Sequence, residues 1–114
     1  MDKQQKRQVA AEYKKRMQEG GVYAIRCIMN DKQILLSTAD LAGSENRFKF
    51  AQSTGGCVHP KLREDWSRYG GAGFAFEVIE TLRQQETQTD AEFHKEIEEL
   101  LDMLISQINP KALY

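Results

Sequence analysis

The stretch from residue 20 to residue 41 constrains the fold of this 114-residue chain more than any other part of it. Two apolar runs, VYAIRCIM and KQILLST, flank an Asn30-Asp31 pair, and this arrangement is typical of a β-hairpin with a two-residue turn. Both alternating sets of positions in the first run are largely apolar, as in a strand that is covered on both faces. The pattern therefore predicts a hairpin whose first strand is central in its sheet.

Helical patterns lie on either side of the hairpin. Apolar residues recur every four positions in residues 2–19, which predicts an N-terminal helix with a narrow apolar stripe, ended by Gly20-Gly21. Residues 40–52 also have helix-like spacing, interrupted by Ala42-Gly43-Ser44. A short helix that runs to Gln52 is therefore expected, with either Ser44 or Asn46 as its cap.

The second half of the chain predicts one more strand between two helices. A helix is expected to start at Pro60 and to end at Gly70-Gly71. The alternation over residues 74–82 predicts a third strand. Thr89 opens a capping box, and the amphipathic helix that follows cannot continue beyond Pro110. Together these elements predict an α+β fold, a three-stranded antiparallel sheet flanked by helices.

Composition narrows the class of protein further. At 40% hydrophobic and 29% charged residues the chain is expected to form one small globular domain. No apolar run approaches the roughly 18 residues of a membrane helix, and the polar start is no signal peptide, so a cytoplasmic location without membrane contact is expected. Cys27 and Cys57 are then expected to be free thiols. With a net charge of −1, any nucleic-acid surface must be a local patch.

Gly21-Val22-Tyr23, followed after the turn by the run from Ser37 to Leu41, resembles the GIY-YIG nuclease family. The two signature tripeptides of that family lie on the first two strands of a hairpin. The order of the predicted elements over residues 20–110 also resembles the family from end to end, and the helix over residues 1–19 lies outside its core pattern. The second tripeptide is not kept, because Leu35-Leu36-Ser37 stands where Tyr-Ile-Gly is expected.

The resemblance implies a set of catalytic positions for hydrolysing phosphodiesters. The family is understood to use hairpin tyrosines, an arginine at the start of the next helix, and a glutamate on the last long helix that holds a divalent ion such as Mg²⁺. Tyr23 matches the first tyrosine, and Arg47 matches the arginine if a three-residue insertion is allowed. Leu35 stands at the second tyrosine and Leu101 at the glutamate. Glu98, at the edge of the apolar stripe of the last helix, is the remaining candidate for a metal ligand.

These matches predict a domain of the nuclease superfamily that is catalytically impaired and keeps a nucleic-acid-binding role. Its contact with DNA is expected to be weak and non-specific, through basic residues that share one face: Arg47, Lys49, Lys61, Arg63 and Arg68. One alternative is a protein-interaction module on a nuclease-like fold, whose contact with a partner would depend on Leu35 or on the acidic last helix. Another is a weak, Mg²⁺-dependent endonuclease that uses Tyr23, Arg47 and Glu98. The sequence names neither a substrate, a partner nor an oligomeric state.

Overall fold

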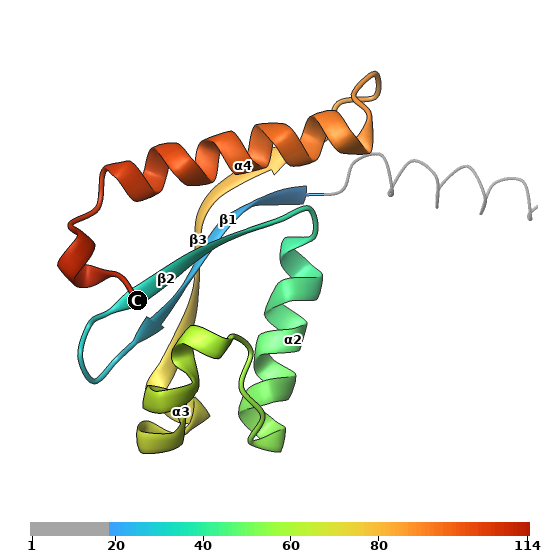
Figure 1. The fold of residues 1–114 in the computed structure, drawn as a ribbon. Coiled ribbons are helices and arrows are strands. Elements are labelled where there is room, and N and C mark those ends of the chain that lie inside the picture. The colour runs from blue at the N-terminus through green and yellow to red at the C-terminus, as the bar shows by residue number, and fades with distance from the viewer. Residues whose placement is uncertain (1–18) are drawn as a thin grey trace, which may run out of the picture.

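The computed structural model of this chain describes residues 19–114. Its centre is an antiparallel sheet of three strands, β1 (Glu19–Cys27), β2 (Gln33–Thr38) and β3 (Phe74–Arg83), in the order β2-β1-β3 (Figure 1). The sequence-based prediction that the first strand is central is therefore confirmed, and so is the third strand. The predicted N-terminal helix falls on residues outside the described part, except for Glu19, which begins β1.

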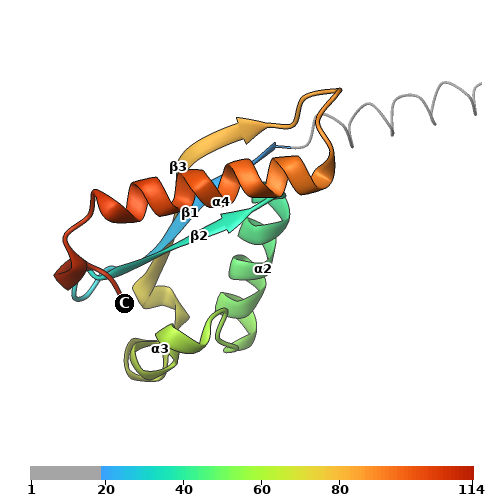
Figure 2. The same ribbon diagram turned by 45° about the horizontal axis from the view of Figure 1, so that its top comes forward.

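Helices cover both faces of the sheet. Helices α2 (Leu41–Thr54) and α3 (Arg63–Tyr69) pack on one face, and α4 (Asp90–Ser106) lies across the other (Figures 1 and 2). Short 3₁₀ turns precede α3, follow it, and follow α4. Because β1 has a helical layer on each side, both of its faces need apolar side chains, which explains why its sequence does not alternate. The predicted α+β class is confirmed. No helix among residues 19–114 is long and apolar enough to cross a membrane.

Each face of the sheet has its own apolar cluster. The cluster under α2 and α3, here the α2-face cluster, consists of the buried residues Ile25, Cys27, Ile34, Phe48, Ala51, Leu62, Trp66 and Phe74. The cluster under α4, here the α4-face cluster, consists of Val22, Ala24 and Leu35 with Leu100, Leu101, Leu104, Ile108 and Leu113 packed against them. Successive residues of a strand point to opposite faces, so neighbours in the sequence of β1 and β2 belong to different clusters.

The turn of the hairpin is longer than predicted. Instead of a two-residue turn at Asn30-Asp31, residues 28–31 form the loop: the Asp31 amide donates to the Cys27 carbonyl (2.9 Å), and the Cys27 amide donates to the Lys32 carbonyl (2.8 Å). Asp31 has a φ of 60°, a conformation that aspartate tolerates better than most residues. The Ile28 amide donates to the Gly73 carbonyl (2.8 Å), which holds this residue toward the β3 side. The loop is therefore set by contacts outside the hairpin.

Helix α2 begins earlier than predicted, and neither Ser44 nor Asn46 is its cap. Asp40 is the N-cap residue, and its carboxylate accepts a hydrogen bond from the Gly43 amide (3.0 Å). A side chain at position 43 would collide with this carboxylate, so the glycine that seemed to interrupt the helix makes room for the cap. As a result, Arg47 lies in the second turn of α2 and Ser44 lies inside the helix.

The remaining helix boundaries follow the sequence signals. The His59 side chain accepts a hydrogen bond from the Lys61 amide (3.1 Å) and caps the turn that leads into α3. Gly70 ends α3 with a φ of 76°. The Thr89 hydroxyl accepts a hydrogen bond from the Glu92 amide (3.1 Å) at the start of α4, as expected of a capping box.

The last residues join three elements at one carboxylate. The Tyr114 hydroxyl donates to Asp65 of α3 (2.7 Å), and the Asn30 side chain in the hairpin loop donates to the same oxygen (2.9 Å). The Tyr114 amide also donates to the Gln33 carbonyl of β2 (3.0 Å). The chain thus passes around the β2 edge, from the α4 face to the α2 face.

Acid is expected to weaken this junction. The hydrogen bond from Tyr114 is the main cause that lowers the pKa of Asp65 below its ordinary value. Because the unfolded chain then takes up this proton more readily, the stabilisation is present above the ordinary aspartate pKa and is lost as the pH falls through the folded-state value. Urea unfolding at about pH 7 and about pH 3 should show a smaller acid-induced loss for Tyr114→Phe than for the unmodified protein. Equal losses would contradict the assignment.

Candidate functional site

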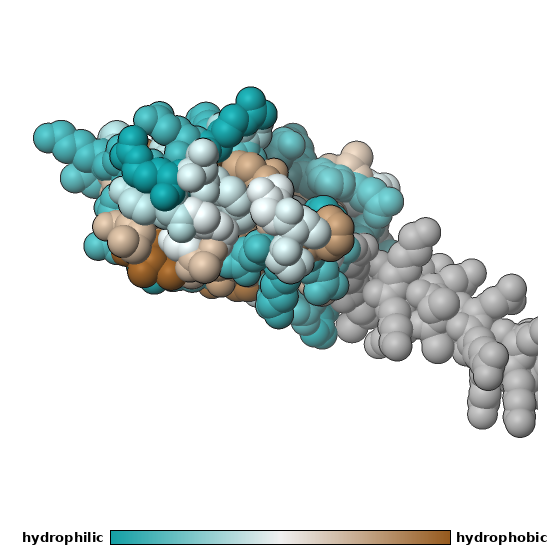
Figure 3. All heavy atoms as spheres, turned by 90° about the horizontal axis from the view of Figure 1, so that it is seen from below, coloured by the Kyte–Doolittle hydropathy of each residue, from teal (hydrophilic) through white to brown (hydrophobic). Residues whose placement is uncertain are grey.

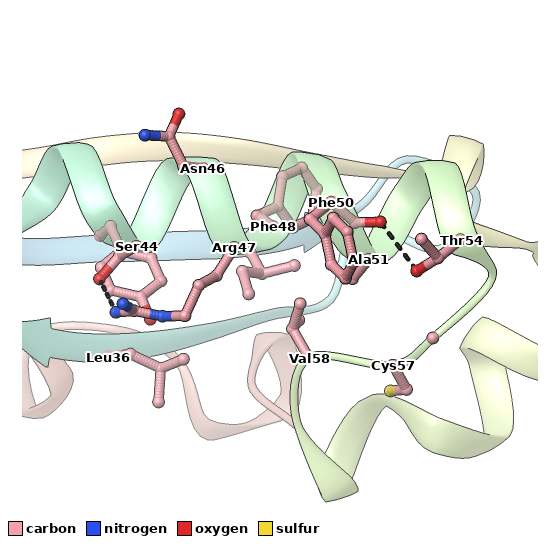
Figure 4. A pocket seen from close by; sticks show the side chains of 13 residues that line it. Leu36, Ser44, Asn46, Arg47, Phe48, Phe50, Ala51, Thr54, Cys57 and Val58 are labelled. Carbon is pink, nitrogen blue, oxygen red and sulfur yellow. Dashed lines mark hydrogen bonds between the residues drawn. The ribbon is translucent and has the colours of Figure 1, made fainter.

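A pocket of about 660 Å³ opens on the α2 face of the sheet. Its walls are α2, the strands β1 and β2, and the loop that follows α2 (Figure 4). The residues that line it are Tyr23, Ile25, Leu36, Ser44, Asn46, Arg47, Phe48, Phe50, Ala51, Thr54, Gly56, Cys57 and Val58. Most of this lining is apolar. Tyr23 of β1 forms a polar corner with Ser44 and Arg47 near the start of α2, and Thr54 lies at the other end of that helix. Seen from below, hydrophobic residues reach the surface in several places that hydrophilic residues border (Figure 3).

A chain of hydrogen bonds organises the polar corner of the pocket. The Arg47 guanidinium donates to the Ser44 hydroxyl (2.9 Å), drawn as a dashed line in Figure 4, and Ser44 donates to the Thr38 hydroxyl (2.9 Å). Thr38 in turn donates to the Asp40 carbonyl (3.1 Å). Ser44 is only 4% exposed, so its hydroxyl needs these partners. The network holds Arg47 along α2 on the side of Tyr23.

Tyr23 is suited to donate a hydrogen bond at this corner. Burial raises the pKa of its hydroxyl above the ordinary tyrosine value, and the Ser44 side chain and the Arg47 charge offset only part of that rise. The phenol therefore stays protonated at neutral pH. Its ring stacks on Phe76 of β3 with 4.7 Å between ring centroids, which fixes its direction. A neutral Tyr23 beside Arg47 can donate a hydrogen bond to an anion together with the guanidinium. The protonated phenol is a poor general base.

The other four predicted nucleic-acid-binding residues do not line this pocket. Lys49 lies on α2 but makes an ion pair with Glu45 (3.0 Å). Arg68 pairs with Glu64 on α3 (3.5 Å). Lys61 belongs to the 3₁₀ turn before α3, and Arg63 begins α3 and lines a separate, smaller hollow. The structure thus brings Tyr23 and Arg47 together and leaves the remaining basic residues around α3 and the outer side of α2.

The two leucines that stand at catalytic positions of the resembled family meet in one apolar cluster. Leu35 is 4% exposed in β2 and faces α4, because its neighbour Leu36 is the residue that lies opposite Tyr23 and lines the pocket. Leu101 is half-buried on α4 and packs against the cluster that contains Leu35. Where the resemblance implies a tyrosine hydroxyl and a carboxylate, this protein has a dry contact between β2 and α4.

Among residues 19–114, the side chains around Tyr23 and Arg47 do not form a site for a Mg²⁺ ion. Glu98 is exposed on α4, on the helix that covers the face opposite Tyr23 and Arg47. In the part of the chain from residue 19 onward, no three His, Cys, Asp or Glu side chains gather in a way that could hold a metal ion. Mg²⁺ needs oxygen ligands, and the family position that would supply one is occupied by Leu101. The role of Glu98 as a metal ligand stays a prediction.

Sequence reasoning missed two contributors to the pocket. Ser44 was interpreted as a possible helix cap, although it orients Arg47 from the turn before it. Phe50 was not singled out, although it lines the pocket and is 68% exposed. An earlier helix start at Asp40 would have revealed both, because Ser44, Arg47 and Phe50 then follow one another at intervals of three along one helix face.

Two solved structures resemble this fold over most of the chain. One is the catalytic domain of the intron endonuclease I-TevI in a mutant form, with a TM-score of 0.60, 20% sequence identity, and coverage of 82% of this chain and 87% of that chain. The other is the catalytic domain of the homing endonuclease I-TevI, with a TM-score of 0.59, 21% identity, and coverage of 81% and 90%. No protein-family model and no curated protein matches the sequence. I-TevI is a GIY-YIG homing endonuclease, and the chain has a GIY-YIG-like fold, as its sequence predicted.

Proposed function

We propose that this domain binds nucleic acid through Arg47 and does not cleave it. The observation that carries the proposal is the packing of Leu35 and Leu101 in the α4-face cluster. A hydroxyl that positions water and a carboxylate that holds a metal would both need polar surroundings at these positions. Two leucines in mutual apolar surroundings supply neither group.

The Arg47 side of the site supports binding of an anion. Among residues 19–114 no carboxylate makes an ion pair with Arg47, whose side-chain partner is the uncharged Ser44. A guanidinium next to a protonated Tyr23 offers several N–H donors and one O–H donor to a phosphate. Since both similar structures are catalytic domains of the endonuclease I-TevI, a nucleic-acid phosphate is the anion that we favour. We also propose that the protein acts in the cytoplasm, as expected from its sequence.

The binding is expected to be weak, independent of sequence and steeply dependent on salt. About three phosphate contacts would give a slope of log K against log salt of roughly −3, and Arg47→Ala should flatten that slope by about 1. Fluorescence anisotropy with a labelled duplex, titrated at several salt concentrations, measures both quantities. Lys95→Ala, which removes an equal charge from the exposed surface of α4, is the matched control and should leave the slope unchanged. No binding by the unmodified protein at about 50 mM salt, either to this duplex or to a single strand of the same length, would contradict the proposal.

A protein-interaction module remains the second candidate function. Its support is the apolar lining of the pocket and the 68% exposed Phe50 at its wall. Sequence reasoning assigned the partner contact to Leu35 or to the acidic last helix, but Leu35 is buried under α4 and is out of reach of a partner. Absence of any nucleic-acid affinity at low salt, together with a partner whose capture is lost in Phe50→Ala, would favour this candidate.

A further inference from the structure

Arg47 and Phe50 present a charge and an aromatic ring side by side. They are three residues apart on α2, so their side chains lie on the same face of the helix, about 5–6 Å apart at Cβ. Both line the pocket; in Figure 4 the Arg47 side chain extends toward Ser44, and the Phe50 ring lies further along α2. Phe50 is 68% exposed although it lies at the wall of an apolar pocket. A large aromatic side chain in such a position leaves one ring face without a partner.

The space next to this pair suits a flat, mainly apolar group. The pocket volume of about 660 Å³ lies within the range of small-ligand sites, roughly 300–1,000 Å³, and exceeds what a nucleobase needs. Leu36 and Val58 line it together with Phe50, while Ser44 and Arg47 lie at its polar corner. The arrangement therefore separates an apolar compartment from a cationic corner.

We infer that the pocket takes an unpaired nucleotide, with the base against Phe50 and the neighbouring phosphate at Arg47. The inference rests on the proposed nucleic-acid binding and narrows its substrate class to single strands. A base stacked in a duplex has no free face for Phe50, whereas an unpaired base stacks on an aromatic side chain whatever its sequence. Lys61, Arg63 and Arg68 do not line this pocket, so Arg47 supplies the positive charge of its lining.

The substitution Phe50→Ala tests the inference. Three labelled probes are titrated with the protein at about 50 mM salt by fluorescence anisotropy. They are a single-stranded DNA of 12 thymidines, a single-stranded RNA of 12 uridines, and a DNA duplex of the same length. The unmodified protein should bind the single strands more tightly than the duplex. Phe50→Ala should weaken single-strand binding about 5- to 150-fold, the range for one lost base stack, and change duplex binding by less than about twofold. The stronger of the two single strands identifies whether DNA or RNA supplies the nucleotide.

Met103→Ala is the matched control, since it removes an exposed apolar side chain from α4 on the other face of the sheet and should change none of the affinities. Because Phe50 is largely exposed, its loss should leave the thermal midpoint nearly unchanged, and this is checked by circular dichroism. Equal affinity for single strands and duplex, or no effect of Phe50→Ala, would overturn the inference while the proposed binding through Arg47 stands. No affinity for any of the three probes would overturn both.

Discussion

Supercoiled plasmid incubated with this protein and Mg²⁺ or Mn²⁺ is expected to remain supercoiled. The positions that the family resemblance assigns to a water-positioning hydroxyl and a metal-binding carboxylate are Leu35 and Leu101, which pack in one apolar cluster. Loss of a single acid–base group typically lowers a rate about 100- to 10,000-fold, and loss of the metal removes charge stabilisation at the phosphate as well. The protonated Tyr23 does not replace either group. Gel electrophoresis after prolonged incubation measures the nicked fraction.

Arg47→Ala is the control that separates activity of this protein from that of a contaminating nuclease. Nicking that is equal in both preparations belongs to a contaminant. Nicking that disappears in Arg47→Ala would contradict the non-catalytic proposal and favour the weak endonuclease. In that case Glu98→Gln is the next variant to prepare, because Glu98 is the predicted metal ligand and this change keeps its size while removing its charge.

Leu35→Ala is expected to lower the free energy of unfolding by about 3 kcal/mol, within the usual 2–5 kcal/mol for a buried leucine. Leu35 is 4% exposed and joins β2 to α4, so its removal leaves a cavity between two elements that can close only partly. A shift of the urea midpoint with an unchanged slope measures the loss. The result matters for function, because it measures how firmly an apolar side chain is required where the resemblance implies a tyrosine.

Leu36→Ala provides the matched comparison for this stability measurement. Leu36 is the next residue of the same edge strand, but it points to the opposite face, is half-buried and lines the pocket. Leu36→Ala should therefore lower the free energy of unfolding clearly less than Leu35→Ala does, since part of the Leu36 side chain is already in contact with water. Equal losses for the two variants would contradict the division of β2 into a dry face toward α4 and a pocket face toward α2.

That division has a direct functional meaning. The α2 face keeps an arginine, a tyrosine and an exposed aromatic ring around a pocket. The α4 face has leucines in place of the groups that the resemblance implies. Binding of a phosphate by Arg47 needs neither of the groups that Leu35 and Leu101 replace, so we propose that binding is kept where hydrolysis is lost. The protein combines a GIY-YIG-like fold with a pocket at which Arg47 and Tyr23 form the pair that we propose to bind a nucleic-acid phosphate.

The sequence by itself determined the elements and their order. Two-sided apolarity predicted that the strand beginning near Val22 is central, and the alternation over residues 74–82 predicted β3. Sequence signals also predicted the turn that starts at Pro60 and leads into α3, and the start of α4 after the capping residue Thr89. Such signals are local, since they depend on backbone geometry and on the period of buried side chains, and they can be recognised in short segments of sequence. The match of Tyr23 to a family tripeptide is also a local signal, because it depends on three consecutive residues.

Only the tertiary structure decided which side chains meet. The hairpin loop lengthened because Ile28 bonds to Gly73, which is distant in the sequence, and the start of α2 depended on the fit of the Asp40 carboxylate over Gly43. A shift of one residue along a strand exchanges the two faces of a sheet, so the sequence could not state that Leu36 lines the pocket while Leu35 joins α4. Contacts between distant segments depend on packing of the whole chain, and it is this packing that places Arg47 beside an apolar pocket.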